Sequence, residues 1–382
     1  MREAPLLSRA LLLLFLASLG GGASFYLLVT VVPLYASRSG GGVGAGLATG
    51  ALMFSTVVAE LLTPRLVTRF GERVALAAGL ILVGAPALAL SATSSLVGIL
   101  AVCLARGLGF GITVVVGSAM VATLVPVERR GEGLGMYGVM VGVPSVVALP
   151  LGVWLVGQIG YPAVFTLGAA AALVSLAATP GLPGREPISE PAVGVLAGLH
   201  TPDLLRPAIV FGATTVAAGI VVTFLPLALP SASEGLVAVA LLVQAVAATA
   251  ARFWAGRHGD RHGSARLILP GVLIAALGIL TLALNTSPIA VVGSMLLFGA
   301  GFGVTQNASL TLMFGRVSSA GYSAVSAVWN LAYDTGMGVG AAVFGVVAVR
   351  TGYPVAFLLT GLVMLSALAP AWRDTRGAAP SR

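Results

Sequence analysis

The sequence contains no lysine, one cysteine and few charged residues of any kind. Charged side chains make up 8% of the 382 residues, against about a quarter in soluble domains, so a soluble protein of this size could not cover its surface with ions. The single cysteine, Cys103, excludes an internal disulfide and a metal site made of several cysteines. The missing lysine excludes a phosphate-binding loop of the G-x-x-x-x-G-K-[ST] type, and with it that kind of nucleotide-driven mechanism.

Apolar residues dominate instead. They make up 58% of the chain, and the mean hydropathy is +1.05. Because a bilayer core about 30 Å thick needs about 20 apolar residues per helix, the chain has room for about a dozen spans. The net charge of +8 comes from arginines spread through short loops, whereas nucleic-acid binding needs a clustered basic face, so we expect no nucleic-acid partner. The predicted solvent is a lipid bilayer.

Twelve apolar stretches separated by charged or Gly/Pro-rich breaks are predicted to be transmembrane helices. The first resembles a signal peptide, but its apolar run continues to Leu34, so we expect an uncleaved helix. Sixteen arginines fall on the side of the N-terminus and two, Arg38 and Arg350, on the other. This asymmetry predicts a multi-pass inner-membrane protein with both termini in the cytoplasm. The predicted helices are 10–35, 45–66, 74–93, 96–124, 133–157, 161–179, 207–229, 236–256, 266–285, 288–314, 324–349 and 353–371.

The two halves of the chain are repeats of each other. The run GYPAVF at 160–165 recurs as GYPVAF at 352–357, and GFG at 109–111 recurs at 301–303; both offsets are 192 residues. Six spans per half is an even number, so both halves insert with the same orientation, and parallel repeats of this kind place a solute site near the midplane where they meet. We therefore predict an all-α membrane protein of two six-helix pseudo-symmetric bundles. The predicted parts are 1–179, a proline-rich cytoplasmic linker at 180–206, and 207–382.

Two charged residues lie deep within predicted helices. Arg106 and Asp334 are each ten residues from the start of a helix, which is about 15 Å at 1.5 Å per residue. A charge at that depth is costly and marks a functional site by default. For Arg106 the alternatives are a role in a solute cavity and a buried structural pair. Asp334 suits proton coupling, because apolar burial raises the proton affinity of a carboxyl and a nearby arginine lowers it; the alternative is an aspartate fixed by Asn330 or Tyr333 to hold helix packing.

A second acid candidate follows from the repeat. Glu60 and Arg252 are 192 residues apart (252 − 60) and lie near the ends of the second and eighth predicted helices. Each is interpreted as a gate or interface charge, or as a side chain that reaches toward the membrane surface. Glu60 is the second candidate proton carrier.

The loop between the eighth and ninth predicted helices reads GRHGDRHG. Its residues Gly256, Asp260, Arg261 and Gly263 match the G-x-x-x-D-R-x-G loop signature, and the chain here resembles the major facilitator superfamily. The resemblance implies a conformational latch, formed by an acid among arginines in a tight turn. The repeat copy keeps Arg69 and Gly71 but has no acid.

His258 and His262 flank the acid of this loop and raise the alternative of a metal site. We expect no metal, because glycines are predicted to interrupt any helix there and the loop signature already explains the acid.

The same resemblance supplies the candidate solute site. In the superfamily the first, fourth, seventh and tenth helices line the centre, and the run YDTG at 333–336 is similar to the eleventh helix of bacterial exporters. One cation among uncharged polar and aromatic groups suits an amphipathic or weakly acidic solute. The implied solute-binding residues are Tyr26, Thr30, Arg106, Thr113, Thr223, Phe224, Gln306, Asn307 and Asn330.

These observations predict a proton-coupled exporter of a small amphipathic organic compound that works by alternating access. The alternative is a proton-coupled uptake symporter, which the same fold supports. A non-transporting membrane sensor is a remote alternative, since the longest segment outside the membrane is the linker. The spans hold no paired acids or histidine cluster, so we expect no enzyme. We expect a monomer in the lipid bilayer with a small-molecule substrate and protons as partners, and neither cofactor nor metal.

Overall fold

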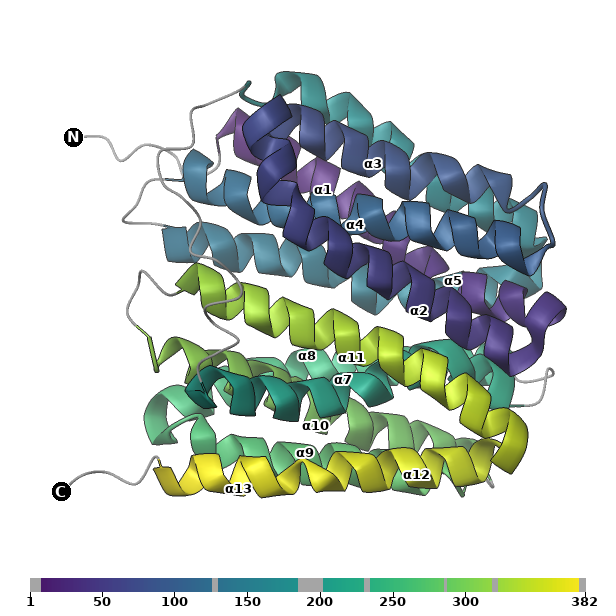
Figure 1. Cartoon of the computed structure of the whole chain (residues 1–382), viewed down its shortest axis with the longest axis vertical. Helices are drawn as coiled ribbons and strands as arrows, with labels where there is room; N and C mark the ends of the chain where they lie inside the picture. The colour runs from purple at the N-terminus through teal and green to yellow at the C-terminus, as the bar shows by residue number, and fades with distance from the viewer. Residues whose placement is uncertain are drawn as a thin grey trace. The chain divides into compact units, whose positions relative to one another are not determined.

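A computed structural model describes residues 8–125, 130–184, 202–229, 234–284, 287–317 and 322–377. Within these ranges the chain is helical and contains no strand (Figure 1). The elements are α1 Arg9–Leu28, α2 Val31–Phe70, α3 Glu72–Ala89, α4 Leu96–Leu124, α5 Arg130–Ser175, the 3-10 helix η2 Leu176–Gly181, α7 Pro202–Ala228, α8 Glu234–His262, α9 Ala265–Leu282, α10 Pro288–Phe314, α11 Tyr322–Thr351, α12 Tyr353–Ser366 and α13 Leu368–Gly377.

Ten helical segments of the described chain are long and apolar enough to cross a membrane. Two of them are too long for one crossing: Arg9–Phe70 has 62 residues and Met140–Gly181 has 42, against about 20 residues for one span. Both contain a glycine with non-helical torsion angles, Gly41 with φ of 57° and Gly160 with φ of 76°. The predicted number of twelve spans is reached only when each segment is divided at its glycine.

Two of the differences from the predicted helix bounds concern the first helix and the linker. The predicted first helix, 10–35, is interrupted by a two-residue turn after Leu28 and resumes at Val31. Helix α7 begins at Pro202, inside the predicted linker, because proline is well suited to the first position of a helix. Residues 185–201 of that linker lie outside the described ranges, and we propose, as predicted, that it joins the two halves.

The prediction that glycines interrupt the helix after residue 256 is wrong. Helix α8 continues through Gly256 and Gly259 to His262, and the chain leaves it at Gly263, where φ is 89°. A glycine inside a helix costs only about 1 kcal/mol relative to alanine. Gly259 also packs closely, since a Cβ there would lie 2.8 Å from the hydroxyl of Ser264. The signature loop is therefore mostly helix.

The repeat predicted from the sequence is present in the backbone. Gly71 and Gly263 follow α2 and α8 with φ of 83° and 89°, and Gly160 and Gly352 have φ of 76° and 79°. The members of each pair are 192 residues apart (263 − 71 and 352 − 160). Positive φ is a conformation that glycine adopts without steric cost. The same turn is thus built at the same position of each repeat.

Helix packing repeats in the same register. A Cβ on Gly107 of α4 would lie under 3.0 Å from the main-chain oxygen of Leu52, and a Cβ on Gly299 of α10 would lie as close to that of Gln244. Both the glycines (299 − 107) and their partners (244 − 52) are 192 residues apart. These glycines let two backbones approach closely, which is how helices associate where lipid provides no hydrophobic drive.

This packing gives a first prediction. Gly299→Ala should destabilise the protein by about 1–3 kcal/mol, because the new methyl group overpacks the contact with Gln244. The control is Gly293→Ala on the same helix, where a Cβ meets nothing within 4 Å, so alanine should stabilise slightly. Thermal unfolding of the two purified variants compares them, and equal unfolding temperatures would show that the close approach has no energetic weight.

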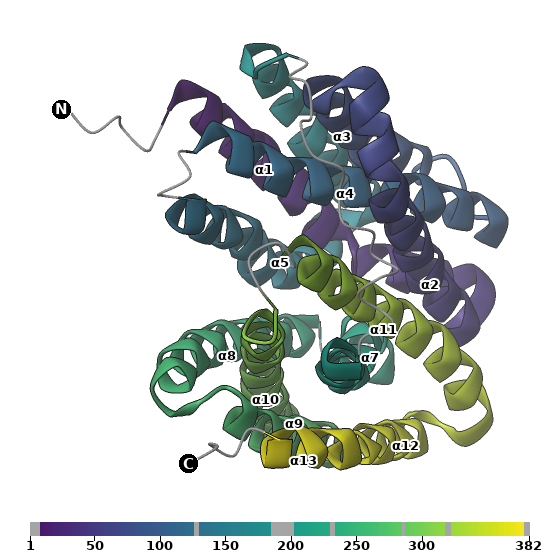
Figure 2. The ribbon, with the colours of Figure 1, turned by 60° about the vertical axis from the view of Figure 1, so that its left-hand side comes forward.

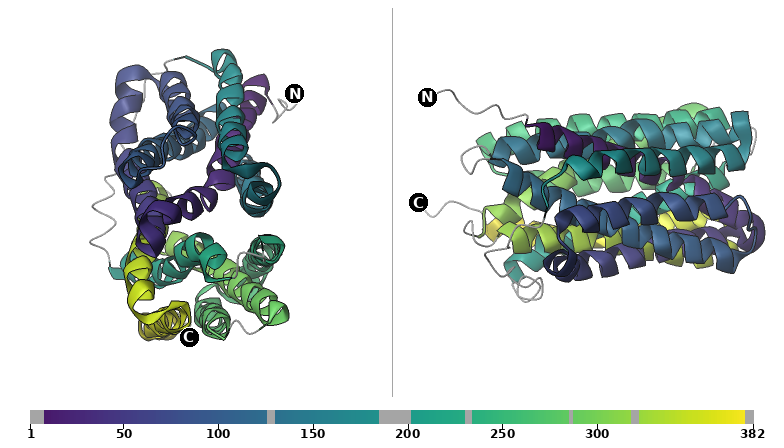
Figure 3. Two further views of the ribbon diagram at one scale, coloured as in Figure 1. Left: turned by 90° about the vertical axis from the view of Figure 1, so that its right-hand side faces the viewer. Right: turned by 90° about the horizontal axis from the view of Figure 1, so that it is seen from above.

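The chain divides into two compact units. The first unit is Met1–Gly44 with Ala51–Pro191, and the second is Ala45–Gly50 with Ala192–Arg382. In the first, α1 packs on α5 and α3 on α4; in the second, α10 packs on α8 and α9, and α7 on α11. Helices α12 and α13 lie along α9 (Figure 2). Within each unit the helices run along a common direction (Figure 3).

Candidate solute and proton site

Four aromatic rings from three helices meet in the second unit. Phe211 of α7 stacks on Trp329 of α11, with ring centroids 4.5 Å apart and planes at 13°. Its centroid is also 5.9 Å from Tyr333 of α11 and 6.1 Å from Phe302 of α10. Trp329 and Tyr333 are four residues apart, so they occupy one face of α11. We call Phe211, Phe302, Trp329 and Tyr333 the ring cluster.

The rings differ in exposure. Phe211 is fully buried at 0% and Phe302 is 6% exposed, whereas Trp329 and Tyr333 are only partly buried. Part of the surface of the two α11 rings is therefore exposed, and the two buried phenylalanines pack against them.

A buried amide oxygen borders the ring cluster. Gln306 lies one helical turn after Phe302 on α10, and Trp329 Nε1 donates a 3.1 Å hydrogen bond to Ser309 Oγ just beyond it. Gln306 is 9% exposed, and its Oε1 has no hydrogen-bond partner among the described residues. Leaving a buried acceptor unpaired costs about 1–3 kcal/mol. This oxygen is suited to accept a hydrogen bond from a solute.

The predicted proton carrier, Asp334, follows directly on the ring cluster. Its side chain is 6% exposed. The neighbouring face of α11 packs on α7, where Thr215 Oγ1 donates to the oxygen of Ala332 at 3.2 Å and a Cβ on Gly336 would collide with Thr215. Asp334 is two residues from both Ala332 and Gly336, about 200° around the helix. Position 334 therefore lies on the opposite side of α11 from positions 332 and 336.

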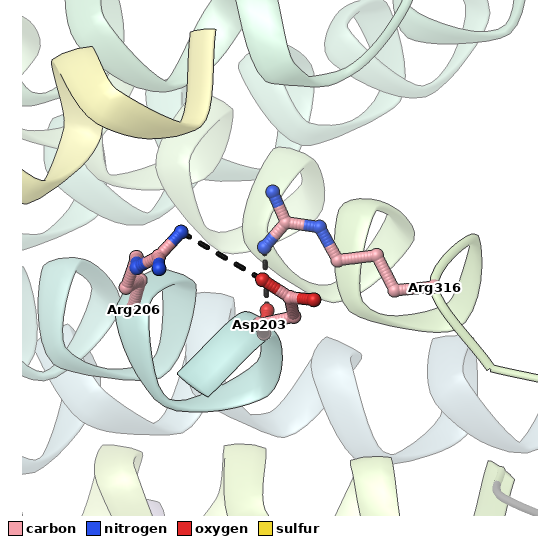
Figure 4. Close-up of polar contacts among 3 residues, drawn as sticks. All are labelled: Asp203, Arg206 and Arg316. Atoms are coloured by element: carbon pink, nitrogen blue, oxygen red, sulfur yellow. Dashed lines mark hydrogen bonds and ion pairs between the residues drawn. The ribbon is translucent and has the colours of Figure 1, made fainter. Parts of the chain in front are cut away.

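The ends of α7 and α10 are also joined. Arg316 Nη1, just after α10, donates to the main-chain oxygen of Asp203 in the first turn of α7, and Arg206 Nη1 lies 3.7 Å from Asp203 Oδ1 (Figure 4). These side chains are exposed, with 43% for Arg206 and 66% for Asp203. Such surface pairs are worth about 0–1 kcal/mol. They secure the helix ends but cannot account for the arrangement of the site.

Arg106, the deep cation of the first unit, contacts main-chain oxygens. It is 2% exposed. Its Nε donates to Val83 O of α3 and its Nη2 to Ser24 O of α1, both at 3.0 Å. The guanidinium thus joins α1, α3 and α4, and we propose that it positions these helices.

The other predicted solute residues of the first unit lie on α1 and α4. Tyr26 is edge-on to Phe25 at 5.2 Å, and Phe25 stacks on Phe110 at 3.5 Å. Thr30 is fully buried at the turn between α1 and α2, and its Oγ1 has no partner among the described residues. Thr113 donates to Phe110 O at 2.8 Å.

Thr113 takes part in helix packing, and its repeat mate does the same. A Cβ on Gly79 would lie 2.8 Å from the Thr113 methyl group, and one on Gly271 would lie 2.7 Å from the Thr305 hydroxyl. Both members of these pairs are 192 residues apart (305 − 113 and 271 − 79). Such contacts explain why a small β-branched residue occupies both positions.

The predicted residues of the second unit do not all lie together. Gln306 is one helical turn from Phe302 on α10, and Asn330 follows Trp329 in sequence on α11. Phe224 instead packs with Phe344 at 4.7 Å and Tyr353 at 6.4 Å; it is 13 residues along α7 from Phe211, or about 20 Å. Thr223 precedes Phe224 in sequence, and its hydroxyl is 2.7 Å from that of Thr49. Asn307 of α10 makes a separate contact, in which its Oδ1 is 3.5 Å from the Thr311 hydroxyl.

The predicted latch residues end two helices. The amides of Gly71 and Gly263 donate to Val67 O and Gly259 O, each at 2.8 Å, and the guanidinium of Arg69 lies 5.2 Å from the ring of Phe70. Gly256 lies within α8 and Arg261 lines a surface pocket. The side chain of Asp260 and residues 126–129 lie outside the described part of the chain, so the latch stays a proposal.

The second candidate acid and the histidine pair lie on α2 and α8. Glu60 is half-buried in α2. His258 and His262 stack on each other at 4.2 Å. Among the described residues there is no group of three or more His, Cys, Asp or Glu that could hold a metal ion.

Sequence reasoning did not select Phe211, Ser309 or Trp329 as site residues. A signal was available in the four-residue spacing of two aromatic pairs, 298 with 302 on α10 and 329 with 333 on α11, which places each pair on one helix face.

Comparison with known proteins confirms the predicted fold. The family model of the Major Facilitator Superfamily matches residues 12–333 and 208–382. No curated protein sequence matches. Similar solved structures include a mutant of the nucleoside transporter NupG, with TM-score 0.78, 14% identity, and coverage of 96% of this chain and 99% of that chain. The partially occluded, inward-open structure of XylE, the xylose transporter from E. coli, has a TM-score of 0.75 and 15% identity, and the match covers 96% of this chain and 97% of that chain. A POT family transporter in complex with 5-aminolevulinic acid has a TM-score of 0.76 and 14% identity, and the match covers 96% of this chain and 97% of that chain. At these identities the structures show the fold alone, while the family model covers most of the chain: this protein belongs to the Major Facilitator Superfamily and is a transporter, not an enzyme.

Proposed function

We propose that this transporter carries a small organic solute with a planar ring and a hydrogen-bond donor, and that the ring cluster forms part of its binding site. The observations that carry the proposal are the stacked pair Phe211–Trp329 and, one helical turn from Phe302 of the ring cluster, the Oε1 of Gln306, which has no hydrogen-bond partner among the described residues. Aromatic pairs contribute about 0.5–1.5 kcal/mol beyond the area they bury. The amide oxygen adds specificity, because it accepts a hydrogen bond from an N–H or O–H group of the solute and disfavours an analogue that lacks such a group.

We further propose that transport is coupled to protons through Asp334. The carboxyl is 6% exposed and next in sequence to Tyr333 of the ring cluster, so solute and proton would be bound at adjacent positions of one helix. Ionisable groups inside a membrane mark proton relays. Half-buried Glu60 is the second candidate carrier.

For the direction we propose export, supported by the similarity of the run YDTG at 333–336 to bacterial exporters. Uptake by symport is the second candidate, supported by the likeness to a solved D-xylose-proton symporter with TM-score 0.77 and 14% identity. We also propose an inner-membrane location and a monomeric state, and, on the arginine distribution, cytoplasmic termini. Accumulation of solute in inverted vesicles but not in intact cells supports export, and the reverse supports uptake.

A binding experiment tests the ring cluster. A thermal-stabilisation screen of the purified protein, with nucleosides and other planar heterocycles against non-aromatic sugars, should select ring-bearing compounds. Trp329→Ala should then weaken binding of the selected compound at least tenfold, which is about 1.4 kcal/mol, because the stacking face and the bond to Ser309 are lost. Trp329→Phe keeps a stacking ring and should lose less.

The matched control is Phe224→Ala, which removes a fully buried ring of α7 outside the ring cluster. It should lower stability and leave solute affinity near that of the wild type. Equal affinity of the wild type and Trp329→Ala would contradict the proposed site.

A further inference from the structure

The last turns of α8 carry six side chains that line one surface pocket. The pocket has a volume of about 300 Å³. Its residues form two columns with four-residue spacing, so each column follows one face of the helix. We call them the α8 end patch: Phe253, Arg257 and Arg261 in one column, and Trp254, His258 and His262 in the other.

Within the patch the rings and cations are already ordered. Trp254 stacks on His258 at 4.8 Å and His258 on His262 at 4.2 Å, both with planes at 21°. The guanidinium of Arg257 lies over the ring of Phe253 at 4.3 Å, a cation–π contact that fixes its position. The side chains therefore change from apolar to cationic along the axis of α8.

The patch faces away from the core of its own unit. Ala255, which follows Trp254 in sequence, is 0% exposed and packs in a core cluster with Ile268 and Val272. Phe253 and Trp254 are 63% and 51% exposed. In a membrane protein, exposed aromatic rings of this kind gather where hydrocarbon meets the polar headgroups.

We propose that the α8 end patch binds the phosphate headgroup of an anionic phospholipid. Eight residues separate Phe253 from Arg261, about 12 Å along the helix, whereas the polar region of one leaflet is about 5–8 Å thick. With the rings at the hydrocarbon boundary, the backbone of Arg257, about 6 Å further along the helix, lies at the depth of the polar region. The backbone of Arg261 lies just beyond that region, and its long side chain can extend back to the same phosphates. Guanidinium groups bind phosphate oxygens through two parallel hydrogen bonds.

The arrangement of charge favours an anion between the two arginines. Arg257 and Arg261 are four residues apart, where like charges on a helix repel each other, and a shared phosphate removes that repulsion. A free phosphate would use the cations alone. Two exposed rings next to them add an apolar surface that fits the glycerol and acyl part of a lipid.

The repeat provides an internal control. The positions 192 residues earlier, at the end of α2, keep the two cations as Arg65 and Arg69 (257 − 65 and 261 − 69) but have Leu62 where α8 has Trp254. The end of α2 therefore keeps the two arginines but has leucine in place of Trp254 and His258, Thr68 in place of Asp260, and one ring, Phe70, at the position of His262. A response at α8 alone would be specific to the patch.

The experiment measures lipid binding to the purified full chain by native mass spectrometry and by thermal shift, with phosphatidylglycerol as the anionic probe and phosphatidylcholine as the zwitterionic one. The double variant Arg257→Gln/Arg261→Gln should lose at least tenfold in apparent affinity for phosphatidylglycerol. The matched double variant Arg65→Gln/Arg69→Gln should keep wild-type affinity, and phosphatidylcholine binding should stay unchanged in both.

A second variant keeps the test decisive if the first does not fold. Trp254→Leu changes no charge and introduces the residue of the repeat, and it should also weaken phosphatidylglycerol binding. Equal losses in the two double variants would overturn the proposal in favour of general charge attraction. Displacement of the lipid by glycerol phosphate at the same concentration would overturn it in favour of a free anion.

Discussion

Asp334→Asn should abolish proton-driven transport and leave solute binding in place. The amide has nearly the size of the carboxyl but cannot take up and release a proton, so only the coupling step is lost. The side chain is 6% exposed, and a carboxyl in such surroundings changes its proton affinity when a cation approaches or leaves. We expect coupled transport in proteoliposomes to fall at least about a hundredfold, equivalent to about 2.7 kcal/mol.

The control for this variant is Asp203→Asn. Asp203 is an acid of the same unit with a side chain that is 66% exposed, so its replacement should leave coupling unchanged. Exchange of labelled for unlabelled solute needs no net proton movement and should survive in Asp334→Asn. Proton-driven accumulation at the wild-type level in Asp334→Asn would remove Asp334 from the mechanism and leave Glu60 as the candidate.

Arg106→Ala should destabilise the first unit strongly. The variant removes two charge-assisted hydrogen bonds, to the main-chain oxygens of Ser24 and Val83, each worth about 1.5–3 kcal/mol. We therefore expect a loss of about 3–5 kcal/mol in unfolding free energy. Arg106→Lys should recover only part of it, because an ammonium group lacks the planar fork that reaches two acceptors.

Thermal unfolding of the purified variants measures this loss, with exposed Arg65→Ala of the same unit as the control. The other role considered from the sequence, in a solute cavity, predicts instead that Arg106→Ala weakens binding of anionic or hydrogen-bond-accepting solutes more than that of neutral apolar ones. An unchanged unfolding temperature together with selective loss of anionic solutes would contradict the positioning role and support recognition.

Much of the fold could be predicted from the sequence, for identifiable reasons. Apolar runs separated by charged breaks locate the helices, because lipid excludes charge from the spans. The turns at Gly71 and Gly160 and at their repeat mates could be predicted, because positive φ strongly favours glycine and these glycines recur at a fixed offset. The burial of Arg106 and Asp334 followed from their depth in apolar stretches.

The rest depended on tertiary packing. Which aromatic residue of α7 meets the rings of α10 and α11 depends on the position and rotation of the helices, so the sequence did not point to Phe211. Phe224, which was predicted to bind solute, packs with Phe344 instead. The continuation of α8 through Gly256 was missed because packing overrides the weak helix propensity of glycine. Thr113 was assigned to a cavity, yet it packs against Gly79, a contact that only the close approach of α3 and α4 creates.

The central claim is that a ring-bearing solute and a proton move together through this transporter, and proton flux driven by a solute gradient tests it most directly. Proteoliposomes holding a pH-sensitive dye receive a gradient of the compound selected in the screen, with no initial pH difference. The account predicts a pH change in wild-type vesicles, none in Asp334→Asn vesicles, and solute exchange in both. Solute movement through the wild type without any pH change would contradict proton coupling.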